Sequence, residues 1–269
     1  MSSNVARQKY IGVISPYDFA LDREIWKWTP KRTDLLMTRT SHLGLPSTVA
    51  MAEGISDDRT LTSRTRALLT TDPDVVLYLC TSGSFVRGAD GERHMRDVMH
   101  GAGARRAITT SGSLVDAAAA LGVTRLAVAT PYLDNVTGCL HEFLHQSGIE
   151  VVGGSGLGID SRIWEVDSAR TRELVFAADR PDAEAVFVSC TNLRTYGLIR
   201  ELEAELGKPV LTANQVSVWN ALRVAGIKAP DIKQRLFLET RGPRRERLAT
   251  VSELPVVPVE PEDLTFHTA

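Results

Sequence analysis

The sequence predicts an α/β protein built from two similar halves, each with a parallel sheet. Short runs rich in β-branched and aliphatic residues alternate with helical stretches along most of the chain. Two of these runs, VVLYLCTS at 75–82 and AVFVSCTN at 185–192, reach the same Cys-Thr pair. Strands separated by helices pair in parallel through crossover connections, and a word that recurs in the same context indicates a duplication.

Each predicted element rests on a local pattern. Apolar runs of five to seven residues predict strands at 10–15, 34–40, 75–80, 105–110, 125–130, 185–190 and 209–214, with a further apolar run at 150–154. Helical spacing of apolar residues predicts helices at 21–28, 57–70, 91–101, 113–121, 134–147, 165–178, 196–206 and 215–225. The helix at 134–147 has the clearest apolar face, and the last helix stops at Gly226, a usual C-terminal residue.

A second repeated word supports the duplication. Ser-Pro-Tyr closes the first strand around Pro16, and Thr-Pro-Tyr closes a later strand around Pro131. The spacing is 64 residues from Pro16 to Cys80 and 59 residues from Pro131 to Cys190. Both words therefore recur in the same order at similar spacing.

The duplication predicts the domain organisation. Lobe one is expected to comprise residues 1–112 plus 209–240, with the strand at 209–214 returning to it, and lobe two residues 113–208. The segment 241–269 begins with clustered arginines and continues with three prolines, which is typical of an extended arm.

Composition and charge exclude several classes of protein. A net charge of -2 gives no electrostatic reason to expect a nucleic-acid or anionic-membrane partner. No apolar run is long enough to span a bilayer, and the N-terminus lacks an apolar signal core, so a cytoplasmic location is expected. Three cysteines form no disulfide framework and have no zinc spacing. His141 and His145, four apart on a helix, are expected on its solvated face, so no metal is expected.

The two repeated cysteines are the main candidates for chemistry. Ligands bind beyond the carboxyl ends of parallel strands, where Cys80 and Cys190 fall. The small residues after Cys80 allow backbone N–H groups to converge on an anion, and Tyr132 ends the other repeated strand. The alternative interpretation is that these cysteines are inert buried thiols. Cys139, on the apolar face of its helix, is assigned to the core in this way.

Other polar residues are compatible with either a structural or a binding role. Asn214 and Gln215 fit helix caps as well as ligands, and Arg87 fits a salt bridge as well as a substrate carboxylate. The glycines at 153–158 lack the Gly-x-Gly-x-x-Gly spacing, because position 159 is isoleucine. No dinucleotide or other cofactor is therefore expected.

Several segments together resemble a known family. CTSGSF followed by RG, ATPYLDNV, SCTN and LGKPVLTANQVSVWNALRVAG are similar to the maleate cis-trans isomerase and arylmalonate decarboxylase branch of the aspartate/glutamate racemase superfamily. The resemblance runs from about Tyr10 to Gly226 and implies two Rossmann-like lobes with the active site in the cleft between them. It also implies a homo-oligomer that needs no cofactor.

The resemblance implies a two-thiol isomerase of a small, maleate-like dicarboxylate, since isomerases and racemases of the superfamily have a cysteine at both positions. Cys80 would be the nucleophile and Cys190 the general acid and base, both with depressed thiol pKa values. The implied substrate-binding residues are Thr81, Ser82, Tyr132, Thr191, Asn192, Pro16 and Tyr17.

Three alternatives remain beside this reading. They are an amino-acid or hydantoin racemase using the same thiols, an arylmalonate-type decarboxylase with Cys190 as proton donor, and a two-lobed carboxylate-binding protein. One departure from the family pattern matters: the first turn contains Asp18, where maleate isomerases have an asparagine that contacts a substrate carboxylate. An acid pointing into the site would repel a dianion.

Overall fold

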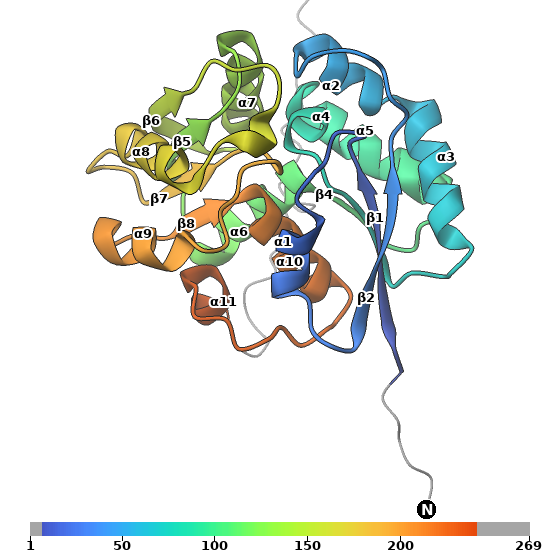
Figure 1. Ribbon diagram of the computed structural model, residues 1–269. Coiled ribbons are helices and arrows are strands. Elements are labelled where there is room, and N and C mark those ends of the chain that lie inside the picture. Colours follow the sequence, from blue (N-terminus) through green and yellow to red (C-terminus); the bar gives the residue numbers. More distant parts are fainter. Residues whose placement is uncertain (1–6, 241–269) are drawn as a thin grey trace, which may run out of the picture.

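The computed structural model describes residues 7–240 as two α/β lobes that lie side by side (Figure 1). The segment 241–269, predicted to be an extended arm, lies outside the described residues. Within 7–240, none of the helices combines the length and apolar character that crossing a bilayer requires.

Lobe one contains a parallel sheet with strand order β2-β1-β3-β4. Its strands are β1 (Lys9–Ser15), β2 (Thr33–Arg39), β3 (Val75–Tyr78) and β4 (Ala107–Thr109). Its helices are α1 (Asp22–Ile25), the 3-10 turn Trp26–Trp28, α2 (Val49–Ile55), α3 (Asp58–Leu69), α4 (Thr81–Phe85) and α5 (Gly88–Gly101).

Lobe two repeats this arrangement with strand order β6-β5-β7-β8, again parallel. Its strands are β5 (Arg125–Thr130), β6 (Glu150–Gly156), β7 (Ala185–Val188) and β8 (Val210–Thr212). Its helices are α7 (Asp134–Gln146), the 3-10 turn Ile163–Glu165, α8 (Ser168–Ala178) and α9 (Ile199–Leu206). The identical order of the two sheets confirms the α/β fold with two similar lobes.

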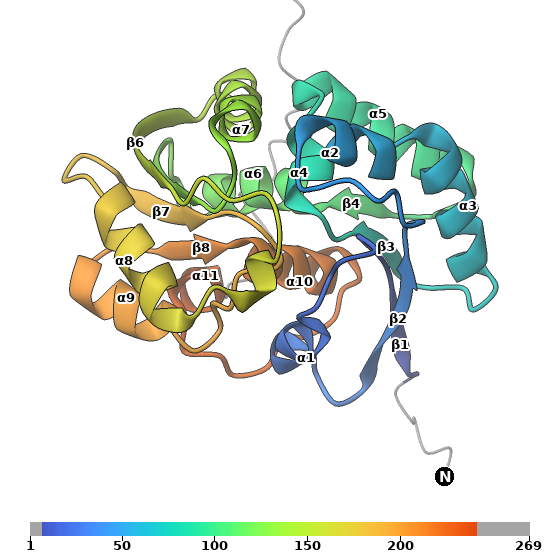
Figure 2. The same cartoon turned by 45° about the horizontal axis from the view of Figure 1, so that its top comes forward.

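The predicted return of the strand at 209–214 to lobe one is wrong. β8 pairs with β7 in parallel, with Val186 opposite Val210, and therefore completes the second sheet (Figure 2). The physical reason is the crossover rule: β7, α9 and β8 form one strand–helix–strand unit, whose second strand lies beside its first. The prediction holds only for the following helix, because α10 (Ala213–Val224) packs against β3 and β4 of lobe one.

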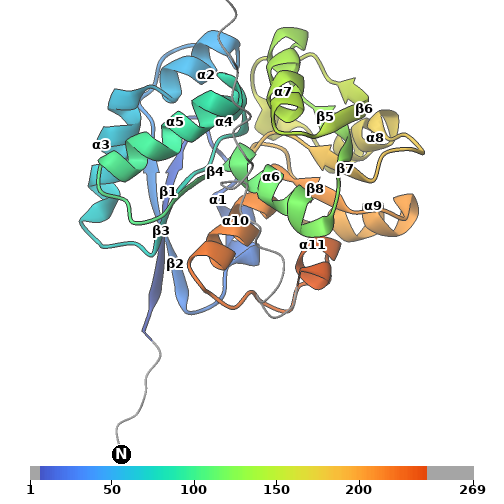
Figure 3. The same cartoon turned by 180° about the vertical axis from the view of Figure 1, so that it is seen from behind.

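Two helices that pack against each other lie between the lobes. α6 (Thr110–Leu121) follows β4 as α10 follows β8, and the two helices pack against each other (Figure 3). Buried polar contacts fix this pairing: the Ser217 hydroxyl donates to Thr110 Oγ1 (2.9 Å) and the Asn220 amide donates to Ser113 Oγ (3.1 Å). The short helix α11 (Arg235–Glu239) closes the described chain beside lobe two.

A buried carboxyl couples stability to pH in lobe two. Glu203 accepts hydrogen bonds from the backbone N–H groups of Val210 (3.4 Å) and Arg235 (3.2 and 3.0 Å), joining α9 to β8 and α11. Burial raises the pKa of Glu203 from 4.5 to about 7. The folded state therefore holds a proton that the unfolded state has lost between these two pH values, and stability falls as pH rises through this window.

We expect Glu203→Gln to remove this contribution, because glutamine keeps an acceptor oxygen but does not ionise. The difference in unfolding free energy between pH 4.5 and pH 7 should change by about 3 kcal/mol at most. Urea unfolding across this range measures it, with exposed Glu201→Gln as control. Identical pH profiles for wild type and Glu203→Gln would contradict the assignment.

Candidate active site

Cys80 lies two residues beyond β3 and is the N-cap residue of α4. Its Sγ accepts a hydrogen bond from the Gly83 N–H (3.4 Å) and lies 3.6 Å from Ser82 Oγ. Only glycine fits at position 83, since a Cβ there would collide with the hydroxyl of Tyr78. The turn after Cys80, whose N–H groups were predicted to converge on an anion, is a short helix, and one N–H of its first turn bonds the sulfur.

Cys190 occupies the matching position two residues beyond β7. Its backbone has φ +89°, a conformation that favours glycine and that other residues adopt only when the surroundings impose it. Its Sγ accepts a hydrogen bond from the Asn192 N–H (3.4 Å). The Tyr132 hydroxyl also donates to this sulfur, and it accepts a hydrogen bond from Ser189 Oγ (3.3 Å). Backbone strain at a buried thiol is typical of functional sites.

The two thiols act on one another electrostatically. The charge of Cys80 raises the pKa of Cys190, and both thiols raise the pKa of Tyr132. Asp18 raises the pKa of both cysteines, so its side chain also lies at this site. The structure therefore brings together the predicted residues Cys80, Cys190 and Tyr132, together with Asp18, from both lobes.

The prediction of depressed thiol pKa values is wrong for this state. The pKa of Cys80 is raised from 9.0 to about 11, and that of Cys190 from 9.0 to about 12. Burial is the main cause, since 4% of Cys80 and 8% of Cys190 is exposed, and it outweighs the N–H and hydroxyl donors. Both thiols are neutral at pH 7 without a ligand.

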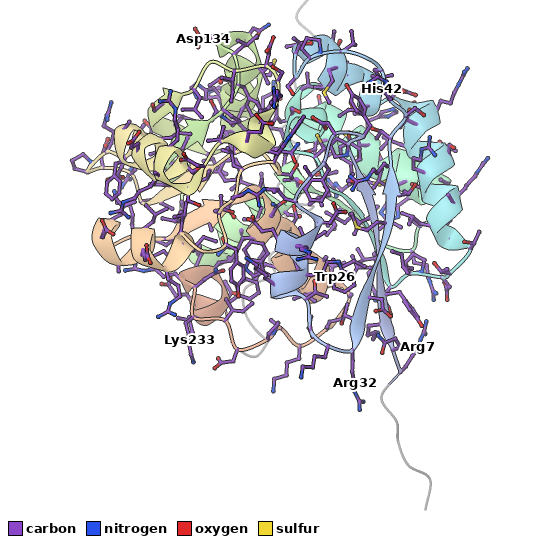
Figure 4. The ribbon with its side chains drawn as sticks, in the orientation of Figure 1. Arg7, Trp26, Arg32, His42, Asp134 and Lys233 are labelled. Atoms are coloured by element: carbon purple, nitrogen blue, oxygen red, sulfur yellow. The ribbon has the colours of Figure 1, made fainter. Side chains whose placement is uncertain are left out.

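The remaining predicted residues fall into two groups. Thr81, Ser82, Thr191 and Asn192 directly follow the two cysteines, and Thr81, Thr191 and Asn192 are buried. Pro16 and Tyr17 lie in the turn after β1, whose backbone oxygens hold Arg39. Tyr17 turns toward the loop before α2, where its hydroxyl donates to the Leu45 oxygen (2.8 Å) and its ring packs edge-on against His42, labelled in Figure 4. Tyr17 is therefore held by this loop.

Two loops meet above the site. The Ser47 N–H, in the segment between β2 and α2, donates to the Asp160 oxygen in the segment after β6 (2.6 Å). Because these segments follow the carboxyl ends of strands in different lobes, their contact closes the edge where the cysteines lie. Two open hollows lie elsewhere, one along α3 and one beside α7, and neither is lined by a predicted site residue.

Two further side chains lie close to the cysteines: Tyr78, which was not predicted, and Asn214, for which the sequence left a ligand and a helix cap open. Tyr78, the last residue of β3, is fully buried; its hydroxyl donates to the Ile55 oxygen (3.1 Å) and lies near Cys80, where it lowers the pKa of that thiol. Asn214 donates to the Thr191 oxygen (2.9 Å), while its own Oδ1 is buried with no hydrogen-bond partner among the described residues. Tyr78 carries a sequence signal, because it lies two residues before one of the repeated cysteines.

Other candidates take structural positions. Gln215 completes a capping box with Thr212, and Arg87 donates to the oxygens of Glu53 and Ser56 at the end of α2. His141 and His145 are exposed on α7. Gly153 and Gly154 lie inside β6 rather than in a phosphate-binding turn, and Cys139, predicted as core, is only half-buried at the edge of the core.

Comparison with known proteins identifies the family. The sequence model described as arylmalonate decarboxylase matches residues 50–237. The chain belongs to this family. It is 35% identical to the arylmalonate decarboxylase of Bordetella bronchiseptica over 172 residues, which cover 62% of this chain and 72% of that protein.

The arylmalonate decarboxylase family also includes isomerases similar to this chain. The maleate isomerase of Geobacillus stearothermophilus is 28% identical over 163 residues, covering 58% of this chain and 65% of that protein. A double mutant of arylmalonate decarboxylase, solved in its liganded form, superimposes with a TM-score of 0.79 at 28% identity, covering 85% of this chain and 98% of that one. The family and the fold agree with the resemblance found in the sequence.

Proposed function

We propose that this chain is a cofactor-independent isomerase in which Cys80 and Cys190 act together on a small carboxylate bound between the lobes. The observation that carries the proposal is the pair of buried thiols, each two residues beyond the matching strand of its lobe, with Asn192 beside Cys190 hydrogen-bonded to the turn after β1 of the other lobe. A decarboxylase that needs a single proton donor gives the second thiol no task. Each sulfur also accepts a hydrogen bond from a backbone N–H and has a tyrosine beside it that lowers its pKa.

With maleate as the reference substrate, the two thiols divide the reaction. Cys80, as thiolate, forms a carbon–sulfur bond to one alkene carbon, and the electron pair moves to the carbon beside the carboxylate. Cys190 gives that carbon its proton, the former double bond rotates, and Cys190 takes a proton back as Cys80 leaves. A cysteine-to-serine mutant of the Nocardia farcinica maleate isomerase was solved with a covalently bound succinylcysteine intermediate, which corresponds to the adduct of this scheme.

The raised pKa of Cys80 places a condition on this scheme. A neutral thiol adds poorly to an alkene, so donors of the protein must stabilise the thiolate when it attacks. The Gly83 N–H and the Ser82 hydroxyl already contact this sulfur and lower its pKa. Thr81, whose buried hydroxyl has no partner among the described residues, is free to bind the substrate carboxylate.

Decarboxylation of a malonate-type acid is the second candidate. The 35% identity to the Bordetella enzyme favours it, and a thiol with a pKa of about 12 suits a proton donor. In this reaction the carbon–carboxylate bond breaks, carbon dioxide leaves with the carboxylate carbon, and the remaining enediolate takes the proton of Cys190.

Product analysis in deuterated water separates the candidates. The enzyme is incubated with maleate, with phenylmalonate and with an amino-acid panel, and the products are followed by proton NMR. Fumarate formation, or α-deuterium in a recovered amino acid, supports the two-thiol isomerase. Phenylacetate with one deuterium and no isomerisation of any other substrate would replace the proposal with decarboxylation.

A further inference from the structure

The turn between β1 and α1 brings an acidic side chain to the thiol pair. One residue of lobe two holds this turn: Asn192 donates to the Asp18 backbone oxygen (3.2 Å) and accepts from the Ala20 N–H (2.9 Å). The N–H of the same Asn192 donates to Cys190 Sγ (3.4 Å). Asp18 is thus held beside Cys190, and its charge acts on both sulfurs.

The carboxyl group of Asp18 makes no ion pair within residues 7–240. Burial raises its pKa, and a hydrogen bond from its own N–H and the charge of Arg39 offset this only in part. The nearby cation, Arg39, is already engaged, because it binds both oxygens of Asp22 (2.9 Å each) and donates to the Phe19 oxygen (2.7 Å). Asp18 is half-buried in a site whose loops are closed. A carboxylate in such a place is costly unless something pairs with it.

Asn214, which hydrogen-bonds the residue after Cys190, also has an acceptor without a donor in the described part of the chain. Asn214 is 1% exposed, and its Oδ1 has no partner among the described residues, while its Nδ2 donates to the Thr191 oxygen (2.9 Å). Exchanging the amide oxygen and nitrogen does not solve this, because two oxygens would then face each other. The oxygen of Asn214 is therefore a second buried acceptor near Cys190 that a donor could satisfy and a carboxylate could not.

Resting on the proposed function, we infer that the substrate carries one carboxylate and, in place of a second, a nitrogen group that donates hydrogen bonds to Asp18. An amine or a primary amide has this chemistry. A second carboxylate at the same place would lie against the half-buried carboxyl group of Asp18, which no ion pair within the described residues neutralises, and like charges repel strongly where water is partly excluded. Asp18 thus sets substrate specificity, while the thiols perform the reaction.

Matched substrates and a matched variant test this inference. Maleate and its half-amide, maleamate, differ only by one carboxylate replaced by a carboxamide, and Asp18→Asn removes only the charge. We expect wild type to prefer maleamate in kcat/KM at least about tenfold, and Asp18→Asn to shift that ratio at least about tenfold toward maleate. Deuterium exchange in an amino-acid panel shows whether an amine replaces the amide.

Binding measurements keep the test decisive without turnover. The saturated analogues succinamate and succinate are titrated into wild type and Asp18→Asn by calorimetry, with Asp18→Ser as the substitute if the first variant fails to fold. The inference is supported if wild type binds succinamate more tightly than succinate and Asp18→Asn loses this preference. An unchanged preference in the variant, or no binding of either succinamate or an amine-bearing acid to wild type, overturns it.

The cysteine variants distinguish this failure from that of the proposed function. If Cys80→Ala and Cys190→Ala lose turnover while Asp18→Asn leaves the preference unchanged, only the role of Asp18 is wrong. If turnover survives in both cysteine variants, the two-thiol reaction itself is wrong.

Discussion

Replacing Cys190 with alanine should lower kcat/KM by about a thousandfold while the protein stays folded. A positioned acid or base contributes about a hundredfold to ten-thousandfold to the rate, and the proposed reaction uses Cys190 as both. The loss of one sulfur removes only the Asn192 and Tyr132 contacts, so the sheet of lobe two should be unaffected.

Cys80→Ala should have an effect of similar size, and the double variant should be no worse than either single one. Residues that act as a unit show this non-additivity. Initial rates on the best substrate, with circular dichroism as the folding check, give the comparison. Cys139→Ala is the matched control, since this half-buried thiol lies on α7 and should keep wild-type rates. Full activity of either active-site variant would contradict the two-thiol mechanism.

Glu24→Ala should lower the free energy of unfolding by about 3 kcal/mol. Glu24, on α1, is buried, and its Oε1 accepts from the Thr195 N–H (2.9 Å), the Thr195 hydroxyl (2.8 Å) and the Tyr196 N–H (3.1 Å). Alanine leaves the N–H groups of Thr195 and Tyr196 without an acceptor, while the Thr195 hydroxyl keeps Thr212 Oγ1 (3.1 Å). Each buried unsatisfied group costs about 1–3 kcal/mol.

The matched variant Glu24→Gln keeps an acceptor oxygen at the same place and should lose much less stability. Glu173→Ala, on the exposed side of α8, controls for loss of a glutamate as such. Urea unfolding followed by circular dichroism gives the free energies. A Glu24→Ala variant as stable as wild type would show that the contact between the segment of α1 and lobe two contributes little.

Most of the fold could be predicted because strands and helices leave periodic signals in the chain. Cys80 and Cys190 were found because a duplication places equivalent residues at equivalent strand ends. The strand that pairs with β8 could not be predicted, because the sequence of a three-residue strand does not specify its neighbour in the sheet. The crossover through α9 places β8 beside β7. α4 was missed because five residues are too few for a helical period.

The electrostatics of the site could not be predicted from the sequence. Small residues after a cysteine indicate N–H donors, and these do contact both sulfurs, but the degree of burial depends on how the two lobes close. That closure makes desolvation the larger effect and raises both thiol pKa values. The orientation of Asp18 likewise depends on Asn192, a residue 174 positions away in the chain.

The most direct test of the central claim is whether one small reagent can join the two thiols. Dibromobimane, which carries two alkylating arms on a compact ring system, is reacted with a Cys139→Ser variant at alkaline pH, where the thiolates form. Mass spectrometry of the digested protein should find one bimane linking the peptides of Cys80 and Cys190 within a single chain. Modification of the two cysteines only separately, with no linked peptide, would contradict a shared site.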